Sequence, residues 1–482
     1  MGVKPFIIAP LFVPKGVDEL TQQVKSGFQH KTINSDLLKK MGQQLWNCSA
    51  LTSDMSCISH LIIQQHFNLP WECLYHPDGY FIAQKIPIIR QMPSTSSQLQ
   101  QTHSPLKILH FATQAEHPNK NPLNLAEEQY FIYQALWAQI QTQQILLHSS
   151  QCGDFERFQD LLNQHWDIII LTAHSITKHD QQSIIFNSET ASYQLISYKQ
   201  IISVFQKSNV NCVILAICES ADLALKLHQL NICNVIGMQY TVLDRATSLF
   251  IQQFCQSIVQ EKNIINVVQI ARLAMQNLLN NNEQWQENEI GQWMIPNLYT
   301  CADEQQLFSQ KPINPKIQTK YLKPLIGRCK QLFKLENMLL KYKKIWLYGV
   351  GGIGKTALAQ ALNQHFIAQH KSIIYLEIEP NQQIEQLPTD KLILVVSRHK
   401  PPSQNWTGFK LSAPSEAEFM LYAQSQGLAY PVLQLRLIYK ILRGNYQGLS
   451  LLQGLPFSTE ATVLRQQLCT VQRYLQAYQS IK

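Results

Sequence analysis

The middle of the chain alternates between short apolar runs and longer amphipathic segments. The apolar runs predict strands at 106–113, 144–150, 167–174, 211–218 and 234–240, and the segments between and after them predict helices at 126–141, 155–164, 197–206, 224–230, 246–260 and 264–280. Apolar strands that alternate with helices are typical of βαβ units and of a mainly parallel sheet buried on both faces. The pattern therefore predicts an α/β fold whose ligand-binding and catalytic groups lie at the carboxyl ends of the strands.

Turn and loop signals organise the rest of the chain. Residues 71–91 predict two strands around a Pro-Asp-Gly turn, and 92–105 are polar and predict a loop. A second α/β pattern begins near 344, and helical patterns follow Pro414. We expect a first domain at 1–305 with its core at about 60–305, a linker at 306–323, a smaller α/β domain at 324–412 and a helical region at 413–482.

The composition is that of a folded protein without a membrane span. Hydrophobic residues make up 45% of the 482 residues, which excludes a mainly disordered chain. No apolar run reaches the roughly 18 residues of a spanning helix, and the start lacks a signal-peptide cleavage pattern, so we expect a cytoplasmic protein. The 11 Cys form no CxxC pair, which argues against a disulfide framework and a structural zinc site.

The positive charge is concentrated in one segment. Ten Lys or Arg and one acid lie in the segment from Lys311 to Lys344, so this segment alone has a net charge of +9. The net charge of the whole chain is +8, so the rest of the chain is close to neutral. A generally basic surface is not indicated, and we do not expect nucleic acid as a partner. The segment could be a solvated linker, lie beside nucleotide phosphates, or touch nucleic acid.

A His and a Cys end two successive predicted strands. His174 closes one strand and Cys218 the next, with one crossover helix between them. A right-handed crossover places such strand ends side by side. Cys and His form a nucleophile–base pair, and backbone N–H groups after the strands could stabilise an oxyanion. Either residue alone would more often be structural, but the pair at matched strand ends favours catalysis.

Several segments in order resemble a known family. They are LPWECL at 69–74, IPIIR at 86–90, LKILHFAT with PLNLAEE, WDIIILTAHS, NCVILAICES, NVIGMQYTVLDRATSLFIQQFCQSI and GQWMIPNLYT, spread over about 60–305. Together they resemble the CHAT domain, a caspase-like (clan CD type) cysteine protease family common in bacteria. The resemblance implies that Cys218 is the nucleophile, that His174 is the general base, and that the N–H groups of Cys218 and Ser175 bind the oxyanion. The family usually has Gly at the position of Ser175, and Gly permits positive φ, so this departure bears on activity rather than on fold.

Three acids are candidates for a substrate pocket. Glu219 and Asp222 follow the proposed nucleophile, and Asp244 follows the next strand. An acid lining the first pocket would favour Lys or Arg before the cut. The alternative is that Glu219 caps the following helix and that Asp222 is solvated.

A phosphate-binding motif opens the second α/β segment. Residues 349–356, GVGGIGKT, fit the pattern GxxxxGK[ST] and lie between a predicted strand and a helix. Backbone N–H groups would cradle the phosphates, Lys355 would reach the β/γ oxygens, and Thr356 would hold Mg²⁺. The glycines of the motif are Gly349, Gly351, Gly352 and Gly354.

The second segment resembles the STAND (NB-ARC-like) class of signalling NTPases. The similar pieces are GVGGIGKTALA, PLIGRCKQLFKLENML at 324–339, SRHK at 397–400 and GNYQGLSLLQGL at 444–455. The resemblance implies a reduced P-loop domain that binds ATP or ADP with Mg²⁺, and Arg398 as a γ-phosphate sensor. The usual strand ending in acids is missing. Glu377 could substitute, but strand order argues against it, so we expect weak nucleotide binding or none and little hydrolysis.

These observations lead to one hypothesis and two alternatives. The leading hypothesis is a gated caspase-like endopeptidase with a nucleotide-binding regulatory domain, acting in bacterial defence or regulated proteolysis. The protease step needs no cofactor, and the expected partners are a protein substrate, a sensor or activator protein, and further copies of the chain. The alternatives are an inactive CHAT scaffold serving as a nucleotide-binding interaction module, and an ATPase switch.

Overall fold

The structure is a computed structural model that divides the chain into two compact units, Met1–Gln318 and Thr319–Lys482. The described residues are 4–480 except 10–12, 93–104, 114, 116, 143, 152, 179–180, 189–190, 262, 281–290, 302–324, 369–372, 379–390, 403–404, 427, 429, 457 and 459. The division falls within the expected linker at 306–323, which itself lies outside the described residues, as does most of the expected loop at 92–105. Each unit is described by itself.

The described part of the first unit contains a nine-stranded sheet. Its order is β1-β2-β5-β14-β13-β12-β8-β6-β7, with bounds Lys4–Ile8, Ile58–Ile63, Ile88–Arg90, Pro296–Thr300, Asn234–Met238, Val210–Ala216, Trp166–Thr172, Leu106–Ala112 and Ile145–Gln151. All neighbours are parallel except β13 and β14, which pair antiparallel. The predicted mainly parallel sheet is confirmed, and the reversal at β14 was not foreseen.

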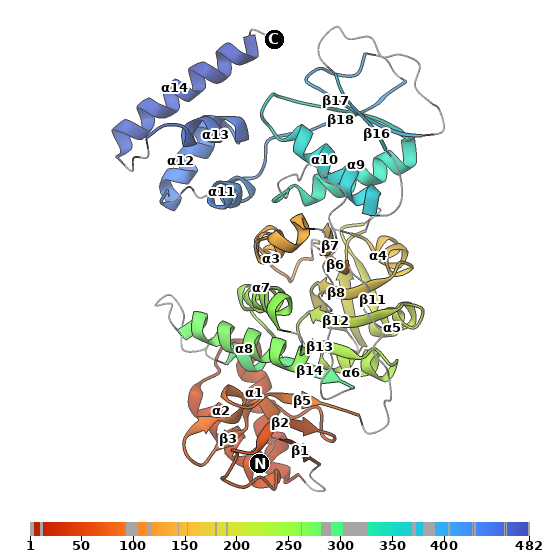
Figure 1. The fold of residues 1–482 in the computed structure, drawn as a ribbon, viewed down its shortest axis with the longest axis vertical. Coiled ribbons are helices and arrows are strands. Elements are labelled where there is room, and N and C mark those ends of the chain that lie inside the picture. Colours follow the sequence, from red (N-terminus) through yellow and green to blue (C-terminus); the bar gives the residue numbers. More distant parts are fainter. Residues whose placement is uncertain are drawn as a thin grey trace. The chain divides into compact units, whose positions relative to one another are not determined.

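Helices cover both faces of this sheet (Figure 1). One face carries α3 (Leu125–Gln141), α7 (Asp244–Gln260) and α8 (Ile264–Asn280), and the other carries α4 (Phe155–Leu162), α5 (Tyr198–Phe205) and α6 (Ala221–Gln229). Side chains of a strand alternate between faces. Accordingly Ile168 and Ile170 of β8 enter one hydrophobic core, while Ile169 and Leu171 enter the other. The unbroken apolar runs in the sequence reflect this burial on both sides.

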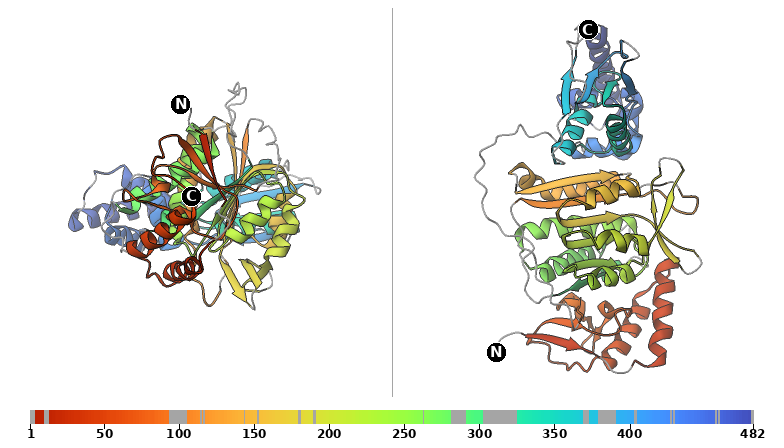
Figure 2. Two further views of the ribbon diagram at one scale, coloured as in Figure 1. Left: turned by 90° about the horizontal axis from the view of Figure 1, so that it is seen from below. Right: turned by 90° about the vertical axis from the view of Figure 1, so that its right-hand side faces the viewer.

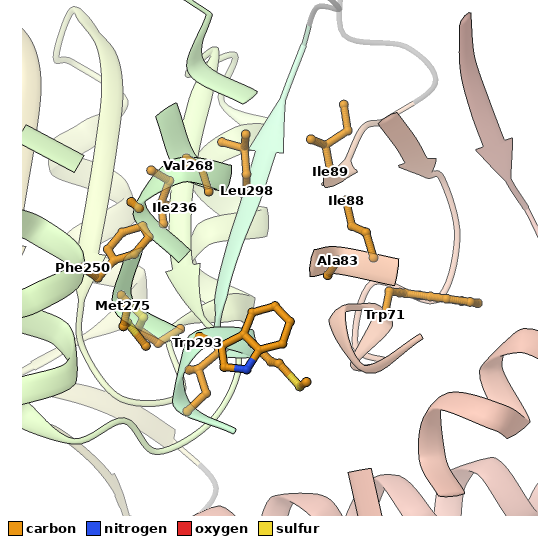
Figure 3. Packing of buried hydrophobic residues seen from close by; sticks show 14 of the residues in the cluster. Trp71, Ala83, Ile88, Ile89, Ile236, Phe250, Val268, Met275, Trp293 and Leu298 are labelled. Carbon is orange, nitrogen blue, oxygen red and sulfur yellow. The ribbon is translucent and has the colours of Figure 1, made fainter. Parts of the chain in front are cut away.

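The N-terminal part of the first unit extends the core across β14. It contains α1 (Lys15–His30), α2 (Ser35–Cys48), the short strands β3 (Tyr75–His76) and β4 (Tyr80–Phe81), and the 3₁₀ turns Trp71–Cys73 and Ile82–Gln84. The predicted Pro-Asp-Gly turn joins β3 to β4, with Gly79 at φ 93°. Figure 3 shows Leu298 of β14 between Ile88 and Ile89 of β5 and Ile236 of β13, with Trp293 below them. The antiparallel strand therefore lies inside the core.

A charged cluster is buried in the same region. Both guanidinium NH groups of Arg90 donate to Glu72, at 2.6 and 2.9 Å, and Arg272 donates to Glu72 Oε1 at 3.1 Å. Burial alone would lower the pKa of Arg90, but Glu72 holds it above its ordinary value, whereas burial lowers the pKa of Arg272. One carboxylate thus compensates two buried guanidinium groups.

A small antiparallel sheet follows β8 directly. Its order is β11-β10-β9, with bounds Gln194–Ser197, Gln181–Phe186 and Ser175–Lys178. These strands carry no clear signal in the sequence, because their apolar and polar positions are mixed. Figure 2 shows the two units from two further directions, with this sheet in yellow at the edge of the first unit.

The second unit has a parallel sheet and a helical region. The sheet order is β16-β17-β15-β18, with bounds Ile373–Glu377, Leu392–Ser397, Lys344–Tyr348 and Thr407–Lys410. The helices are α9 (Cys329–Tyr342), α10 (Lys355–Ala368), α11 (Glu416–Ser425), α12 (Val432–Leu442), α13 (Tyr446–Gln453) and α14 (Ala461–Ser480). The helical region predicted beyond Pro414 is confirmed, whereas β18 was missed.

Candidate cysteine protease site and phosphate loop

The structure brings His174 and Cys218 to one edge of the large sheet. β8 and β12 are parallel neighbours in the register Thr172↔Ala216, and each candidate lies two residues beyond its strand. Both side chains line a cavity of about 60 Å³, together with Leu123, Thr172, Ala173, Ala216, Val242, Asp244 and Thr247. The adjacency inferred from the crossover is present.

The hydrogen bond of His174 fixes its neutral tautomer. Nε2 lies 2.7 Å from the carbonyl oxygen of Asn121, which can only accept, so Nε2 carries the proton. Nδ1 of the neutral ring then has a free lone pair. Burial lowers the pKa of His174, the hydrogen bond to Asn121 opposes this change, and the nearby Lys120 and His117 act in the same direction as burial. His174 is therefore a neutral base in this structure.

Cys218 is also neutral here. Its thiol donates to the carbonyl oxygen of Val242 at 3.5 Å, and the structure shows no hydrogen bond between Cys218 and His174. Burial raises the pKa of the thiol, and the carboxylates of Glu219 and Asp244 raise it further, although Lys120 opposes them. The two side chains share a cavity but do not form a thiolate–imidazolium pair.

Ser175 does not need the backbone freedom of glycine. It is absent from the described residues with positive φ. The N–H of Ile185 donates to the carbonyl oxygen of His174 at 2.9 Å, so these two residues form a hydrogen-bonded pair between the strands. Hydrogen-bonded and non-hydrogen-bonded pairs alternate along an antiparallel ladder, so the N–H of the next residue, Ser175, points away from β10. The Ser175 hydroxyl donates to the carbonyl oxygen of Cys218 at 2.7 Å. The side chain that replaces glycine thus ties the two strand ends together.

The three candidate acids have different surroundings. Asp244 lines the cavity and accepts the N–H of Asn124 at 2.8 Å, and burial raises its pKa. Asp222 is exposed in the first turn of α6. Glu219 does not cap α6, since its carboxylate binds Lys25, Gln29 and Thr241 instead. Burial alone would raise the pKa of Glu219, but the bonds from Gln29 and Lys25 hold it below its ordinary value.

A buried polar network beside the cavity was not predicted. Glu128 Oε1 accepts from Thr172 at 2.7 Å and lies 2.8 Å from Nε2 of His110, whose Nδ1 lies 3.0 Å from Ser149 Oγ. The network joins α3 to β6, β7 and β8, and Thr172 also lines the cavity. The polar residues within three otherwise apolar strands were the signal available in the sequence.

In the second unit, residues 349–354 of the motif form the loop between β15 and α10, and Lys355 and Thr356 begin α10. Gly352 and Gly354 take φ of 74° and 97°, so these two positions require glycine. Lys355 Nζ donates to the carbonyl oxygens of Gly349 and Val350, at 2.9 Å each. Burial lowers the pKa of Lys355, and the guanidinium of Arg398 lowers it further. Two cations therefore converge on the loop, which fits an anion.

Strand order does not keep Glu377 from the loop, which corrects the sequence-based argument. β16 pairs directly with β17, and Glu377 at its end accepts a hydrogen bond from Thr356 Oγ1 at 2.9 Å. In the described part of the second unit no further strand separates β16 from β17, so the carboxyl end of β16 reaches the start of α10. A carboxylate and a hydroxyl oxygen together suit Mg²⁺, which prefers oxygen ligands.

The helical region of the second unit contacts the loop. Asn445 Nδ2 donates to the Gly351 carbonyl at 2.9 Å, and the Tyr446 N–H donates to the Gly352 carbonyl at 3.0 Å. Buried Arg328 donates to the carbonyls of Ile353 and Ser412, at 3.0 and 2.8 Å. The segments around 328 and 444–455, which resemble segments of STAND NTPases, thus contact the loop.

The fold and the first site define a class of protein. An α/β sheet covered on both faces, with Cys and His at adjacent strand ends, is the arrangement expected of a cysteine-protease-like domain. The family model of the CHAT domain matches residues 38–412, which is more than half of the chain and extends into the second unit. The chain therefore belongs to the CHAT domain family, and this membership supports a cysteine-protease-like function.

Solved structures of low similarity were also found. The Arg-specific cysteine proteinase gingipain R has 11% identity and a TM-score of 0.37, with 64% of this chain and 78% of that chain covered. The complex of the Porphyromonas gingivalis RgpB pro- and mature domains has 8% identity and a TM-score of 0.38, with 62% and 78% covered. The Saccharomyces cerevisiae separase–securin complex has 14% identity and a TM-score of 0.32, with 56% and 18% covered. A search of curated proteins finds no match.

No helix among the described residues is both long enough and apolar enough to cross a membrane.

Proposed function

We propose that the first unit is a cysteine endopeptidase in which Cys218 is the nucleophile and His174 the general base. The observation that carries the proposal is that both side chains line one cavity at adjacent strand ends. The hydrogen bond of His174 to Asn121 supports it, since it leaves Nδ1 able to accept a proton. The domain would correspond to the predicted segment 1–305.

The proposed reaction has two halves. In the first, Sγ of Cys218 bonds to the peptide carbonyl carbon while the thiol proton moves to Nδ1 of His174. The N–H groups of Cys218 and Ser175 would stabilise the oxyanion, and His174 returns the proton to the leaving amine as the C–N bond breaks. In the second, water attacks the thioester while His174 takes its proton, and His174 then returns the proton to Sγ as the C–S bond breaks, which releases the acid and the free thiol.

The activity would be gated. A thiol with a raised pKa, bonded to the Val242 carbonyl, is a poor nucleophile until it is turned toward His174. We assign the gate to a partner sensor or activator protein, to self-association, or to nucleotide in the second unit. Bacterial defence or regulated proteolysis in the cytoplasm is the setting that this mechanism fits.

The second unit would bind ATP or ADP with Mg²⁺ as a reduced STAND-like P-loop domain. Lys355 and Arg398 would hold the phosphates, and Thr356 and Glu377 would hold the metal ion, which neutralises phosphate charge when bound. Gly349, Gly351, Gly352 and Gly354 let the loop backbone approach the phosphates. The domain would span 324–412, with the helical region 413–482 against the loop.

The protease proposal is tested by mapping new protein N-termini in bacterial cells. Cells expressing the wild type are compared with cells expressing Cys218→Ala and His174→Ala, and Cys57→Ala serves as a matched control because Cys57 is an exposed thiol. New termini with the wild type and Cys57→Ala, and none with the other two, are expected. Identical maps in all four, also with candidate partners and MgATP, would refute the proposal.

The nucleotide proposal is tested by titrating the full chain with ATP and ADP in a calorimeter. Lys355→Ala should abolish binding, whereas Glu377→Gln should remove only the part that depends on Mg²⁺. Lys391→Ala is the control, because Lys391 is exposed outside the loop. Equal affinity for wild type, Lys355→Ala and Lys391→Ala would refute a site at this loop.

A second candidate function is an inactive scaffold that acts as a nucleotide-binding interaction module. The missing Cys218–His174 hydrogen bond and the raised thiol pKa favour it. A biological effect of the protein that persists in Cys218→Ala would support the scaffold over the protease.

A further inference from the structure

Helix α1 contacts the loops on either side of Cys218. Lys25 Nζ lies 3.0 Å from Glu219 Oε2, and Gln29 Nε2 donates to Glu219 Oε1 at 2.8 Å. On the same helix, the buried ring of Phe28 stacks on Tyr240, with centroids 5.2 Å apart and planes at 16°. The helix spans Lys15–His30 and so lies wholly before the matched segment 38–412. These contacts therefore come from a helix outside the segment that the CHAT family model matches.

Glu219, the residue after Cys218, has an unfavourable backbone conformation. Its φ is 55°, which L-residues other than Asn and Asp rarely adopt. Such a conformation persists where surrounding contacts hold it. The contacts here are the two from α1, a hydrogen bond from Thr241 Oγ1 at 3.2 Å, and the bond from the Glu219 N–H to the Tyr240 carbonyl at 3.2 Å.

The contacts to Tyr240 and Thr241 also connect to the group that accepts the Cys218 thiol. Tyr240 and Thr241 lead directly to Val242, whose carbonyl accepts the Cys218 thiol. Helix α1 thus contacts the loop that contains Cys218 and also the loop whose Val242 carbonyl accepts the Cys218 thiol. A shift of α1 would change the direction of Cys218 without any contact to the substrate.

We infer that Lys25 and Gln29 are positioning residues for Cys218, acting through Glu219, so that α1 is part of the proposed active site. The inference rests on the proposed function for its catalytic meaning. Both oxygens of Glu219 are already bonded, to three donors in total. This favours positioning over a role for Glu219 in binding a basic substrate side chain.

The test uses the full chain with Lys25→Met, Gln29→Ala, Lys25→Arg and Glu219→Gly, and with Lys40→Met on α2 as the control, because Lys40 is exposed. Three quantities are measured: kcat and KM for a cleaved peptide, and the limiting rate at which iodoacetamide alkylates Cys218 at high pH, followed by peptide mass spectrometry. Exposed Cys57 provides the internal reference for alkylation. Glycine at 219 accepts the positive φ but cannot be held by α1.

For Lys25→Met we expect kcat to fall about tenfold with KM nearly unchanged, and the limiting alkylation rate of Cys218 to rise about tenfold, since one charged hydrogen bond is lost. Lys25→Arg should behave like the wild type. In the Glu219→Gly background, Lys25→Met should have no further effect, because the coupling is gone.

Three results would overturn the inference: no difference between Lys25→Met and Lys40→Met, faster cleavage by Lys25→Met, or the same loss in the Glu219→Gly background. If the wild type cleaves nothing, also with candidate partners and MgATP, the proposed protease fails, but the alkylation rates still decide whether α1 positions Cys218. The two failures are therefore distinguishable.

Discussion

Glu72 should be one of the most sensitive positions of the first unit. Its side chain and those of Arg90 and Arg272 are at most 1% exposed, and the cluster holds two positive charges and one negative charge. Glu72→Gln keeps the size of the side chain but removes the carboxylate. The guanidinium groups keep backbone acceptors, Leu69 and Phe67 for Arg90 and Pro296 for Arg272, but lose their only anion in the described part of the cluster.

The expected loss follows from the burial of these charges. Breaking a buried ion pair by removing one partner lowers the free energy of unfolding by about 3–5 kcal/mol. For a unit of this size, with an unfolding entropy of about 2 cal/mol/K per residue, the loss corresponds to a melting temperature lower by about 5–8 °C. The effect should be concentrated where β5 and β14 pair, because Arg90 belongs to β5 and Arg272 binds Pro296 of β14.

The assay is scanning calorimetry of the full chain, with hydrogen exchange of peptides from β5 and β14 to assign the transition. Glu156→Gln is the matched control, since Glu156 is exposed on α4. Replacing Glu72 and Arg90 together by Met should recover part of the loss, because a charge is removed with its partner. A shift no larger than that of Glu156→Gln would refute the reasoning.

Two further predictions concern the site. Because burial raises the pKa of Cys218 and only the thiolate reacts, its alkylation should be slow at pH 7 and still accelerating above pH 9; a plateau below pH 8, measured by iodoacetamide kinetics, would contradict the neutral pair. Ser175→Gly should not raise cleavage, and it should lower the free energy of unfolding by about 1–2 kcal/mol through loss of the bond to the Cys218 carbonyl and gain of chain freedom. Urea unfolding with Ser175→Ala as the comparison separates these two contributions, and a glycine variant that is equally stable and faster would show the argument to be wrong.

The sequence predicted what short-range patterns determine. The apolar runs ending at His174 and Cys218 predicted both strands. They also predicted that the strands are neighbours, because two parallel strands joined by one helix usually lie side by side in a sheet. The glycine spacing located the turn between β15 and α10 for the same local reason. These features depend on residues close together in the chain.

What the sequence did not predict depends on contacts between distant segments. Lys25 and Gln29 meet Glu219 across about 190 positions, and Thr356 meets Glu377 only because β16 lies directly beside β17. The antiparallel β14 is buried along its whole length, as the parallel β12 is, so burial gives no local signal of its direction. Strand order and helix docking decide such contacts, and neither is encoded in periodicity.

In both candidate sites a reactive group is bonded to a backbone carbonyl. The Cys218 thiol donates to Val242, and the Lys355 ammonium donates to Gly349 and Val350. Exchanging one hydrogen bond for another of the same kind changes the free energy little. A substrate or a phosphate that offers a better acceptor could therefore turn these groups without unfolding any element. The raised pKa of Cys218 comes first from burial, which substrate binding would change, so the neutral thiol fits a resting protease and does not by itself require an inactive scaffold.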